Sequence, residues 1–379
     1  MTMTQLTDSY TFRHGATVTN RIVQPPMQTF SGLEGGFVSE ETLKHYQRRN
    51  QSAGLIIAEF HYVSENGGPA SRKGMPSQLG AYSDAHLDGL TKLAQTIKAE
   101  GNKAILQIHH AGHQARARAA KGLAVYAPSA LELDFVDYPL TELNQEQIDD
   151  IVTDFAKATK RAIQAGFDGV EIHGANHYLI QQFFSKTTNQ RQDQYGGSLE
   201  NRMGFAKEVT QAVSQVARQD GPKDFIVGYR ISPQEIHDHM VGYTADEACL
   251  LVKELQQFQL DYVHLSLFES FNAKGKGSDQ TFAEMFKQVM DPETALIIVG
   301  NIFDAQAAQE ALALTDLIGI GRGILIEPDF AKKIVDGKAE TIRSRFDQSA
   351  LEDLAWTRAM TKAFLDPNSH LRNLPGLEK

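Results

Sequence analysis

The feature that most constrains the fold of this chain is a repeated alternation of short apolar runs and amphipathic stretches. We interpret the apolar runs as eight strands, at Arg21–Met27, Leu55–Phe60, Lys103–Ile108, Gly169–Ile172, Phe225–Ile231, Tyr262–Leu265, Ala295–Val299 and Leu317–Ile320. Apolar residues at helical spacing predict helices at His86–Ala99, Gln147–Ala165, Ser198–Val216, Ala245–Phe258, Thr281–Met290 and Asp304–Leu312. This alternation predicts a closed parallel (β/α)8 barrel, a TIM barrel; an open, doubly wound sheet is the alternative.

The sequence predicts a single α/β domain over residues 1–379, because it contains no linker and no low-complexity segment. The barrel core is expected at about residues 20–340. Residues His110–Glu142 are long for a connection after the third strand, so they are expected to cap the barrel mouth. Residues 344–379 form a C-terminal extension, which we expect to pack against another subunit.

Composition excludes several classes of partner. The formal net charge of −10 argues against nucleic acid and anionic membranes. The one cysteine, Cys249, excludes disulfides and Cys-ligated zinc or iron–sulfur clusters within the chain. The segment Met1–Arg13 lacks the apolar run of a signal peptide, and no apolar run approaches the ~20 residues of a membrane span. We therefore expect a cytoplasmic protein.

The segment after the fourth strand carries the most specific chemistry. Residues Glu171–Tyr178 read Glu-Ile-His-Gly-Ala-Asn-His-Tyr, which places His173 and Asn176 three residues apart. On one helical turn such residues share a face, so two neutral donors would point at one acceptor, such as a carbonyl oxygen. Tyr178 supplies a phenolic proton nearby. This set suits the reduction of a double bond conjugated to a carbonyl.

Other strand ends predict a site for an anion and a flat ring. Gly300-Asn301 follows the seventh strand and Gly319–Gly323, with Arg322, follows the eighth, where such barrels commonly bind phosphate. Tight helix–strand packing is the alternative reason for these glycines. Gln107 and Arg230 would face the barrel axis and bind an electron-accepting heterocycle. In the alternative interpretation, Arg230 is a structural partner of Glu59 or Glu171.

Several motifs in order resemble the Old Yellow Enzyme family of FMN-dependent ene reductases over nearly the whole chain. They are Asn20–Val23 leading into Pro25-Pro26-Met27, Gly54–Glu59, Gln107 with His110-Ala111-Gly112, Gly166–His173, Tyr195–Arg202 and Gly319–Arg322. The resemblance implies FMN as cofactor, NADH or NADPH as hydride donor and a homo-oligomer. It also implies hydride transfer from flavin N5 to the C=C bond of an α,β-unsaturated carbonyl or nitro compound.

The resemblance also implies a role for each site residue. Pro25, Pro26, Met27 and Gln28 line the flavin, and Phe60 contacts it through the backbone. Gln107 binds the pyrimidine edge, Arg230 lies by N1 and O2, and Gly300, Asn301, Gly321 and Arg322 hold the phosphate. His173 and Asn176 bind the substrate oxygen, and Tyr178 protonates the α carbon.

Two positions depart from the family pattern. Many members carry Cys or Thr where Gln28 stands, and a substrate-binding Tyr where Phe30 stands. Flavin potential and substrate preference are therefore expected to differ from those members. The sequence does not separate NADH from NADPH as the donor.

Two other functions remain as alternatives. A related flavoprotein could act as an NADH oxidase that passes electrons to oxygen, because that activity uses the same site. A metal-dependent barrel hydrolase is suggested by the histidines, which are grouped as His109, His110 and His113, as His173 and His177, and as His237 and His239. The first strand offers no His-x-His ligand pair and the eighth no acidic ligand, which disfavours the hydrolase.

Overall fold

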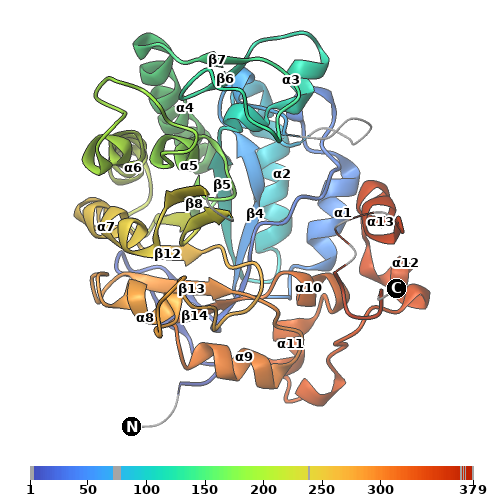
Figure 1. Ribbon diagram of the computed structural model, residues 1–379. Helices are drawn as coiled ribbons and strands as arrows, with labels where there is room; N and C mark the ends of the chain where they lie inside the picture. Colours follow the sequence, from blue (N-terminus) through green and yellow to red (C-terminus); the bar gives the residue numbers. More distant parts are fainter. Residues whose placement is uncertain are drawn as a thin grey trace.

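In the computed structural model, eight parallel strands close into a barrel with helices around it (Figure 1). The barrel strands are β3 (Ile22–Gln24), β4 (Leu55–Tyr62), β5 (Lys103–His109), β8 (Gly169–Gly174), β9 (Ile226–Ile231), β12 (Tyr262–Leu265), β13 (Ala295–Val299) and β14 (Leu317–Gly319). β14 pairs with β3 and closes the ring. The structure describes residues 4–70, 78–237, 240–367, 369, 371 and 373–377. The predicted barrel is confirmed, and the open-sheet alternative is wrong.

The first strand is shorter than predicted. β3 ends at Gln24, whereas the predicted strand ran to Met27. Pro25 and Pro26 have no backbone N–H and cannot donate to a neighbouring strand, so the ladder stops before them. The chain therefore leaves the barrel at Pro25 and passes over its mouth.

The helices follow the predicted periodicity. They are α2 (Leu87–Lys98), α4 (Gln145–Gln164), α6 (Leu199–Asp220), α7 (Ala245–Leu255), α8 (Phe282–Lys287) and α9 (Ala305–Leu312). Capping boxes begin three of them, with Asn144, Thr244 and Thr281 as the capping residues. The sequence analysis missed α1 (Glu40–Arg48), because this polar helix buries only Thr42, His45 and Tyr46.

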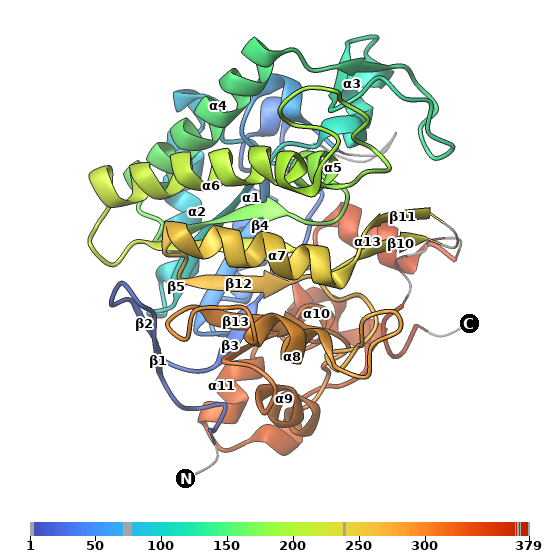
Figure 2. The same ribbon diagram turned by 60° about the vertical axis from the view of Figure 1, so that its left-hand side comes forward.

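The two ends of the barrel differ. At the N-terminal end, the hairpin of β1 (Tyr10–Thr11) and β2 (Thr17–Val18) places Phe12 and Val18 against the apolar interior of the barrel. At the opposite end lies the hairpin of β10 (Glu235–His237) and β11 (Met240–Tyr243), as Figure 2 shows. The N-terminal end is therefore packed with apolar side chains.

The insertion after β5 lies over the mouth, as predicted. It contains α3 (Arg116–Ala120), β6 (Val125–Ala127) and β7 (Leu140–Glu142). Its Ala115 and Val125 form an apolar cluster with Tyr178, against which Phe60 also packs. The insertion thus covers one side of the site predicted from the sequence.

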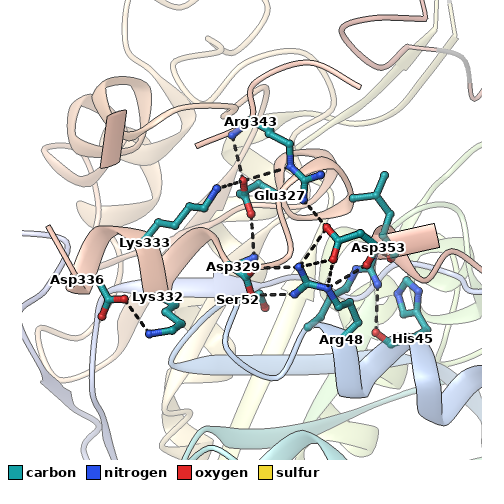
Figure 3. A network of polar contacts seen from close by, with 12 residues as sticks. His45, Arg48, Ser52, Glu327, Asp329, Lys332, Lys333, Asp336, Arg343 and Asp353 are labelled. Carbon is teal, nitrogen blue, oxygen red and sulfur yellow. Dashed lines mark hydrogen bonds and ion pairs between the residues drawn. The ribbon is translucent and has the colours of Figure 1, made fainter. Parts of the chain in front are cut away.

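The C-terminal extension packs on its own barrel. It contains α12 (Leu351–Leu354) and α13 (Arg358–Leu365), and Trp356 Nε1 donates to the carbonyl of Leu325 at 2.9 Å. Ion pairs reinforce this contact (Figure 3): Arg48 on α1 binds Asp329 through two bonds of 2.8 Å and also binds Asp353 of the extension. A contact between the extension and another subunit stays a prediction.

We find no helix in the described ranges with the length and apolar character needed to cross a membrane.

Candidate active site

A cavity of about 440 Å³ opens at the C-terminal ends of the barrel strands. Its size is typical of a site for a cofactor or small ligand. The predicted site residues that line it are Pro25, Pro26, Met27, Gln28, Phe30, Asn176, Arg230, Gly300, Asn301, Gly321 and Arg322. The structure therefore brings together residues from the ends of five strands that are far apart in sequence.

The other predicted residues lie beside this cavity rather than in its wall. The rings of His173, Tyr178 and Phe60 form a cluster, with centroids 4.9 Å apart for His173–Tyr178 and 5.7 Å for Phe60–His173. His173 on β8 pairs in register with Arg230 on β9, which does line the cavity. Gln107 lies deeper, paired in register with Glu171.

The prediction that His173 and Asn176 share one face of a helix is wrong. β8 continues to Gly174, so His173 is a strand residue, and helix α5 (Leu179–Phe184) begins only after Tyr178. Between them, Asn176 and His177 have left-handed backbone angles, with φ of 57° and 61°. Asn tolerates this conformation better than most residues, which a helical pattern does not reveal.

The strained turn is held by side chains to which the sequence analysis assigned no role. Gln114 Nε2 donates to the carbonyls of Asn176 and His177, at 2.8 and 2.9 Å. Ser232 Oγ accepts from the Asn176 backbone N–H at 3.0 Å, and Ser266 Oγ lies 2.9 Å from Asn176 Oδ1. These bonds fix a backbone that would otherwise be costly. Ser232 and Ser266 directly follow β9 and β12, so inspection of every strand end could have found them.

His173 is a neutral hydrogen-bond donor. Burial, and then the charge of Arg230, hold the pKa of His173 well below its ordinary value. Its Nδ1 accepts from the Ala175 backbone N–H at 3.3 Å, so the proton of the neutral ring belongs on Nε2. Nε2 is buried without a partner among the described residues. A buried N–H of this kind is suited to a ligand oxygen.

Tyr178 keeps its proton. Its side chain is buried beside His173, and burial raises the pKa of the phenol well above its ordinary value. The hydroxyl also interacts with Gln78, which lowers the pKa by a smaller amount. Tyr178 is therefore a phenol, and a possible proton donor, throughout the neutral pH range.

Arg230 does not form the direct ion pair with Glu59 or Glu171 that the alternative interpretation required. In the part of the chain that the structure describes, Arg230 forms no ion pair, and its buried Nε has no hydrogen-bond partner. Glu59 is instead bound by Thr29, and Glu171 accepts from Gln107 Nε2 at 2.6 Å. Burial lowers the pKa of Arg230, and the charge of Glu171 opposes that shift.

The glycines after β13 and β14 serve two purposes. Gly319 and Gly321 both line the cavity. An added Cβ at Gly319 would lie 2.4 Å from Val299 Cγ1, and one at Gly323 would lie 2.5 Å from the carbonyl of Ile302. Gly319 and Gly323 therefore permit tight packing, and Gly319 and Gly321 border the ligand space. Arg322 bonds to the side chain of Asn301 and, at 2.9 Å, to the carbonyl of Asn373 in the extension. The packing reason is confirmed at Gly319 and Gly323, and the phosphate role stays a prediction.

We expect Gly300→Ala to weaken FMN binding by about 10-fold or more, because strain of this kind costs roughly 1–3 kcal/mol. Gly300 has a φ of 142°, and an added Cβ would lie 2.5 Å from the backbone nitrogen of Phe271. The affinity is measured by quenching of FMN fluorescence on titration with apoprotein. The control is Gly101→Ala, where φ is 87° but no atom lies within 4 Å of the added Cβ. Equal losses in the two variants would contradict a role for Gly300 in holding the phosphate.

The loop that lines the cavity is tied to a buried carboxyl group. Glu59 Oε2 accepts from the Thr29 backbone N–H at 2.9 Å, and Oε1 accepts from the Thr29 hydroxyl. Thr29 lies between Gln28 and Phe30, both in the cavity wall. Burial raises the pKa of Glu59 from 4.5 to about 7, although the bonds from Thr29 oppose this shift.

This raised pKa predicts a stability that falls with pH. The folded state holds the Glu59 proton more tightly than the unfolded chain does, so the contribution is complete below about pH 4.5 and is lost as the pH rises through about 7. The loss amounts to roughly 3 kcal/mol. Melting temperatures are measured for the native protein and for Glu59→Gln from pH 5 to 8. The value for the native protein should fall relative to that of Glu59→Gln as the pH rises. Parallel curves would refute the prediction.

The metal-site alternative receives no support from the geometry. Within the described ranges, no three His, Cys, Asp or Glu side chains are grouped so that they could hold a metal ion. The rings of His237 and His177 are tilted relative to each other, with centroids 5.3 Å apart, and His239 lies outside the described residues. His110 is buried, and its Nε2 lies 3.1 Å from Asn66 Oδ1.

Buried polar atoms that have no partner within the described part of the chain fit a flavin at this site. They include Gln107 Oε1, Arg230 Nε, His173 Nε2 and Gln28 Nε2. A heterocycle with donors and acceptors along one edge would satisfy such atoms, which are costly when left unpaired. Gly300, Gly321 and Arg322, at the other end of the cavity, suit a phosphate.

Comparisons with known proteins agree with this geometry. A family model described as the NADH:flavin oxidoreductase / NADH oxidase family matches residues 11–341. The probable NADH-dependent flavin oxidoreductase YqiG of Bacillus subtilis is 37% identical over 345 residues, or 89% of this chain and 90% of the relative. The NADH:acrylate oxidoreductase of Vibrio harveyi is 40% identical over 342 residues, or 88% of this chain but 33% of the relative.

Solved structures show the same architecture. The Old Yellow Enzyme homologue from Zymomonas mobilis has a TM-score of 0.76 at 26% identity, covering 94% of this chain and 99% of its own. Morphinone reductase in complex with tetrahydroNAD has a TM-score of 0.75 at 28% identity, covering 94% and 97%. The chain therefore belongs to the NADH:flavin oxidoreductase / NADH oxidase family, of the Old Yellow Enzyme type, and is an NAD(P)H-dependent flavin oxidoreductase that uses FMN.

Proposed function

We propose that this enzyme reduces the C=C bond of α,β-unsaturated carbonyl or nitro compounds. The observation that carries the proposal is the buried Nε2–H of a neutral His173, which has no partner among the described residues and lies at the same strand end as Asn176 in the cavity wall. A carbonyl or nitro oxygen bound there would gain negative charge as the double bond is reduced. Preorganised neutral donors stabilise such charge.

FMN would occupy the cavity with its phosphate at one end and its ring at the other. The residues for the phosphate end are Gly300, Asn301, Gly321 and Arg322, and those for the ring are Pro25, Pro26, Met27, Gln28, Phe60, Gln107 and Arg230. When bound, FMN supplies the group that accepts hydride from NADH or NADPH and passes it to the alkene. The chain supplies the binding energy, the orientation and the proton.

The substrate would be held and protonated by three residues. His173 and Asn176 would bind its oxygen, and the bonds of Ser232 and Ser266 keep Asn176 in place. Tyr178 would give a proton to the α carbon, because its phenol is protonated and its ring lies 4.9 Å from that of His173. Phe30 and Gln28 border the same space and would influence which alkenes fit.

One relative's name supports an acceptor of this class. The NADH:acrylate oxidoreductase of Vibrio harveyi is named for an unsaturated acid, in which the double bond is conjugated to a carboxyl group. This chain spans about a third of that relative, so the name supports the class of substrate rather than a particular one.

Transfer of electrons mainly to oxygen is the second candidate, and the family description, which includes NADH oxidases, favours it. Absorbance spectroscopy separates the two. Under anaerobic conditions NADH or NADPH should bleach the yellow protein, and cyclohexenone should restore the colour. Recovery of colour only on admission of oxygen would support the oxidase and overturn the ene reductase.

A further inference from the structure

A buried cluster of polar side chains lies inside the barrel below the proposed ring site. Its central residue belongs neither to the proposed phosphate site nor to the substrate donors. This residue is Glu171 on β8, which has no exposed surface. One carboxyl oxygen accepts from Gln107 Nε2 at 2.6 Å, and the other lies 2.8 Å from His264 Nδ1. Gln107 on β5 and Glu171 are register partners, so the short bond joins neighbouring strands.

The carboxylate determines which way the Gln107 amide faces. An ionised carboxylate only accepts hydrogen bonds, so the NH2 group of Gln107 must face Glu171. The amide oxygen then lies on the other side, where it is buried without a partner in the described part of the chain. An acceptor left in this state is costly unless a ligand donor meets it, such as the ring N–H of a flavin.

His264 supports this arrangement. Burial lowers the pKa of His264, so the ring is neutral, and its Nδ1 must carry the proton that bonds to Glu171. His264 on β12 also pairs in register with Arg230 on β9. Gln107 on β5 and His264 on β12 thus donate to Glu171. Arg230 on β9 is the cation whose charge Glu171 opposes.

We propose that Glu171 is a positioning residue for the cofactor: it fixes the Gln107 amide with its oxygen toward the flavin, and its negative charge counters that of Arg230. This rests on the proposed function, in which Gln107 and Arg230 face the ring. Glu171 itself does not contact the reacting atoms. Its two effects, as an acceptor and as a charge, can be separated by substitution.

Two variants separate the effects. Glu171→Met has a side chain of similar length that cannot accept a hydrogen bond from Gln107. It should weaken FMN binding to the apoprotein by about 10-fold, because the Gln107 amide is no longer oriented toward the flavin and one hydrogen bond is lost. Glu171→Gln retains an acceptor oxygen and should bind FMN within about 3-fold of the native protein. Because this variant lacks the charge, the midpoint potential of its FMN should shift in the positive direction. If Glu171→Met does not fold, Glu171→Gln and its potential still test the proposal.

A double-mutant cycle with Gln107→Met tests whether Glu171 acts through Gln107. Positioning predicts that Glu171→Met costs little further affinity when Gln107 is already replaced. The same 10-fold loss in both backgrounds would overturn the proposal, as would a loss in Glu171→Gln equal to that in Glu171→Met. Asp261→Asn is the matched control, because Asp261 is a fully buried carboxylate just before β12, at the other end of the barrel. It should leave FMN affinity and potential unchanged.

The results also distinguish this proposal from the proposed function. If Gln107→Met weakens FMN binding and Glu171→Met does not, the ring site stands and the positioning role is wrong. If Gln107→Met leaves FMN affinity unchanged, both the ring site at Gln107 and the positioning role are wrong.

Discussion

Replacing Tyr178 by phenylalanine is expected to lower the rate of enone reduction by about 100- to 10,000-fold, the range typical of a lost general acid. The change removes one oxygen from a buried ring that packs against His173 and Phe60, so the fold should be retained. Reduction of the bound flavin by NADH or NADPH needs no proton from Tyr178 and should be nearly unchanged. Stopped-flow absorbance measures the two half-reactions separately.

The matched control for this variant is Tyr82→Phe, which removes a phenol that donates to the carbonyl of Gly35 at 3.1 Å, outside the cavity. It should leave both half-reactions unchanged. A Tyr178→Phe enzyme that reduces cyclohexenone at the native rate would show that another group, or water, supplies the proton.

Replacing His173 by alanine is expected to lower kcat for enone reduction by about 100- to 1,000-fold, because one preorganised donor to the developing oxyanion is lost. Since His173 is neutral at all pH values near 7, its pKa should not appear in the pH–rate profile. Steady-state kinetics from pH 6 to 9 test both statements. Asn176→Ala should act in the same direction.

His86→Ala is the control for the loss of a buried histidine, because His86 bonds to Ser83 and Gly35 and does not line the cavity. If His173→Ala keeps native kcat and substrate affinity while FMN remains bound, the substrate oxygen is held elsewhere. If an inflection near pH 6.5 disappears in His173→Ala, the histidine titrates in the native enzyme and the neutral-donor argument is wrong.

Most of the barrel was predictable because its strands are buried on both faces. Runs such as Ala295–Val299 are wholly apolar, and their lengths and spacing indicate the (β/α)8 repeat directly. α1 was not predictable in this way, because its surface is mainly polar and it is fixed by contacts such as the two bonds from Arg48 to Asp329. Its position depends on a residue 281 positions away in sequence, which local patterns do not record.

The site was predictable where it coincides with strand ends and only partly elsewhere. The rule that barrel function lies at the C-terminal ends of strands leads to Arg230, Gly300 and Gly321. It does not reveal the left-handed turn at Asn176, nor the bonds from Gln114 that hold it. Those features depend on tertiary contacts with the insertion after β5, so an argument from helical spacing was unable to find them.

The contribution of the C-terminal extension to the cavity couples ligand binding to chain folding. Met360, Phe364, Leu371 and Asn373 of the extension line the same space as Pro25 and Gly321 of the barrel. A ligand that fills this space binds two parts of the chain together, so it must protect the extension from local unfolding. By thermodynamic reciprocity, whatever loosens the extension must release the ligand by the same factor. Resistance of the tail to proteases should therefore report how much of the protein is loaded with its cofactor.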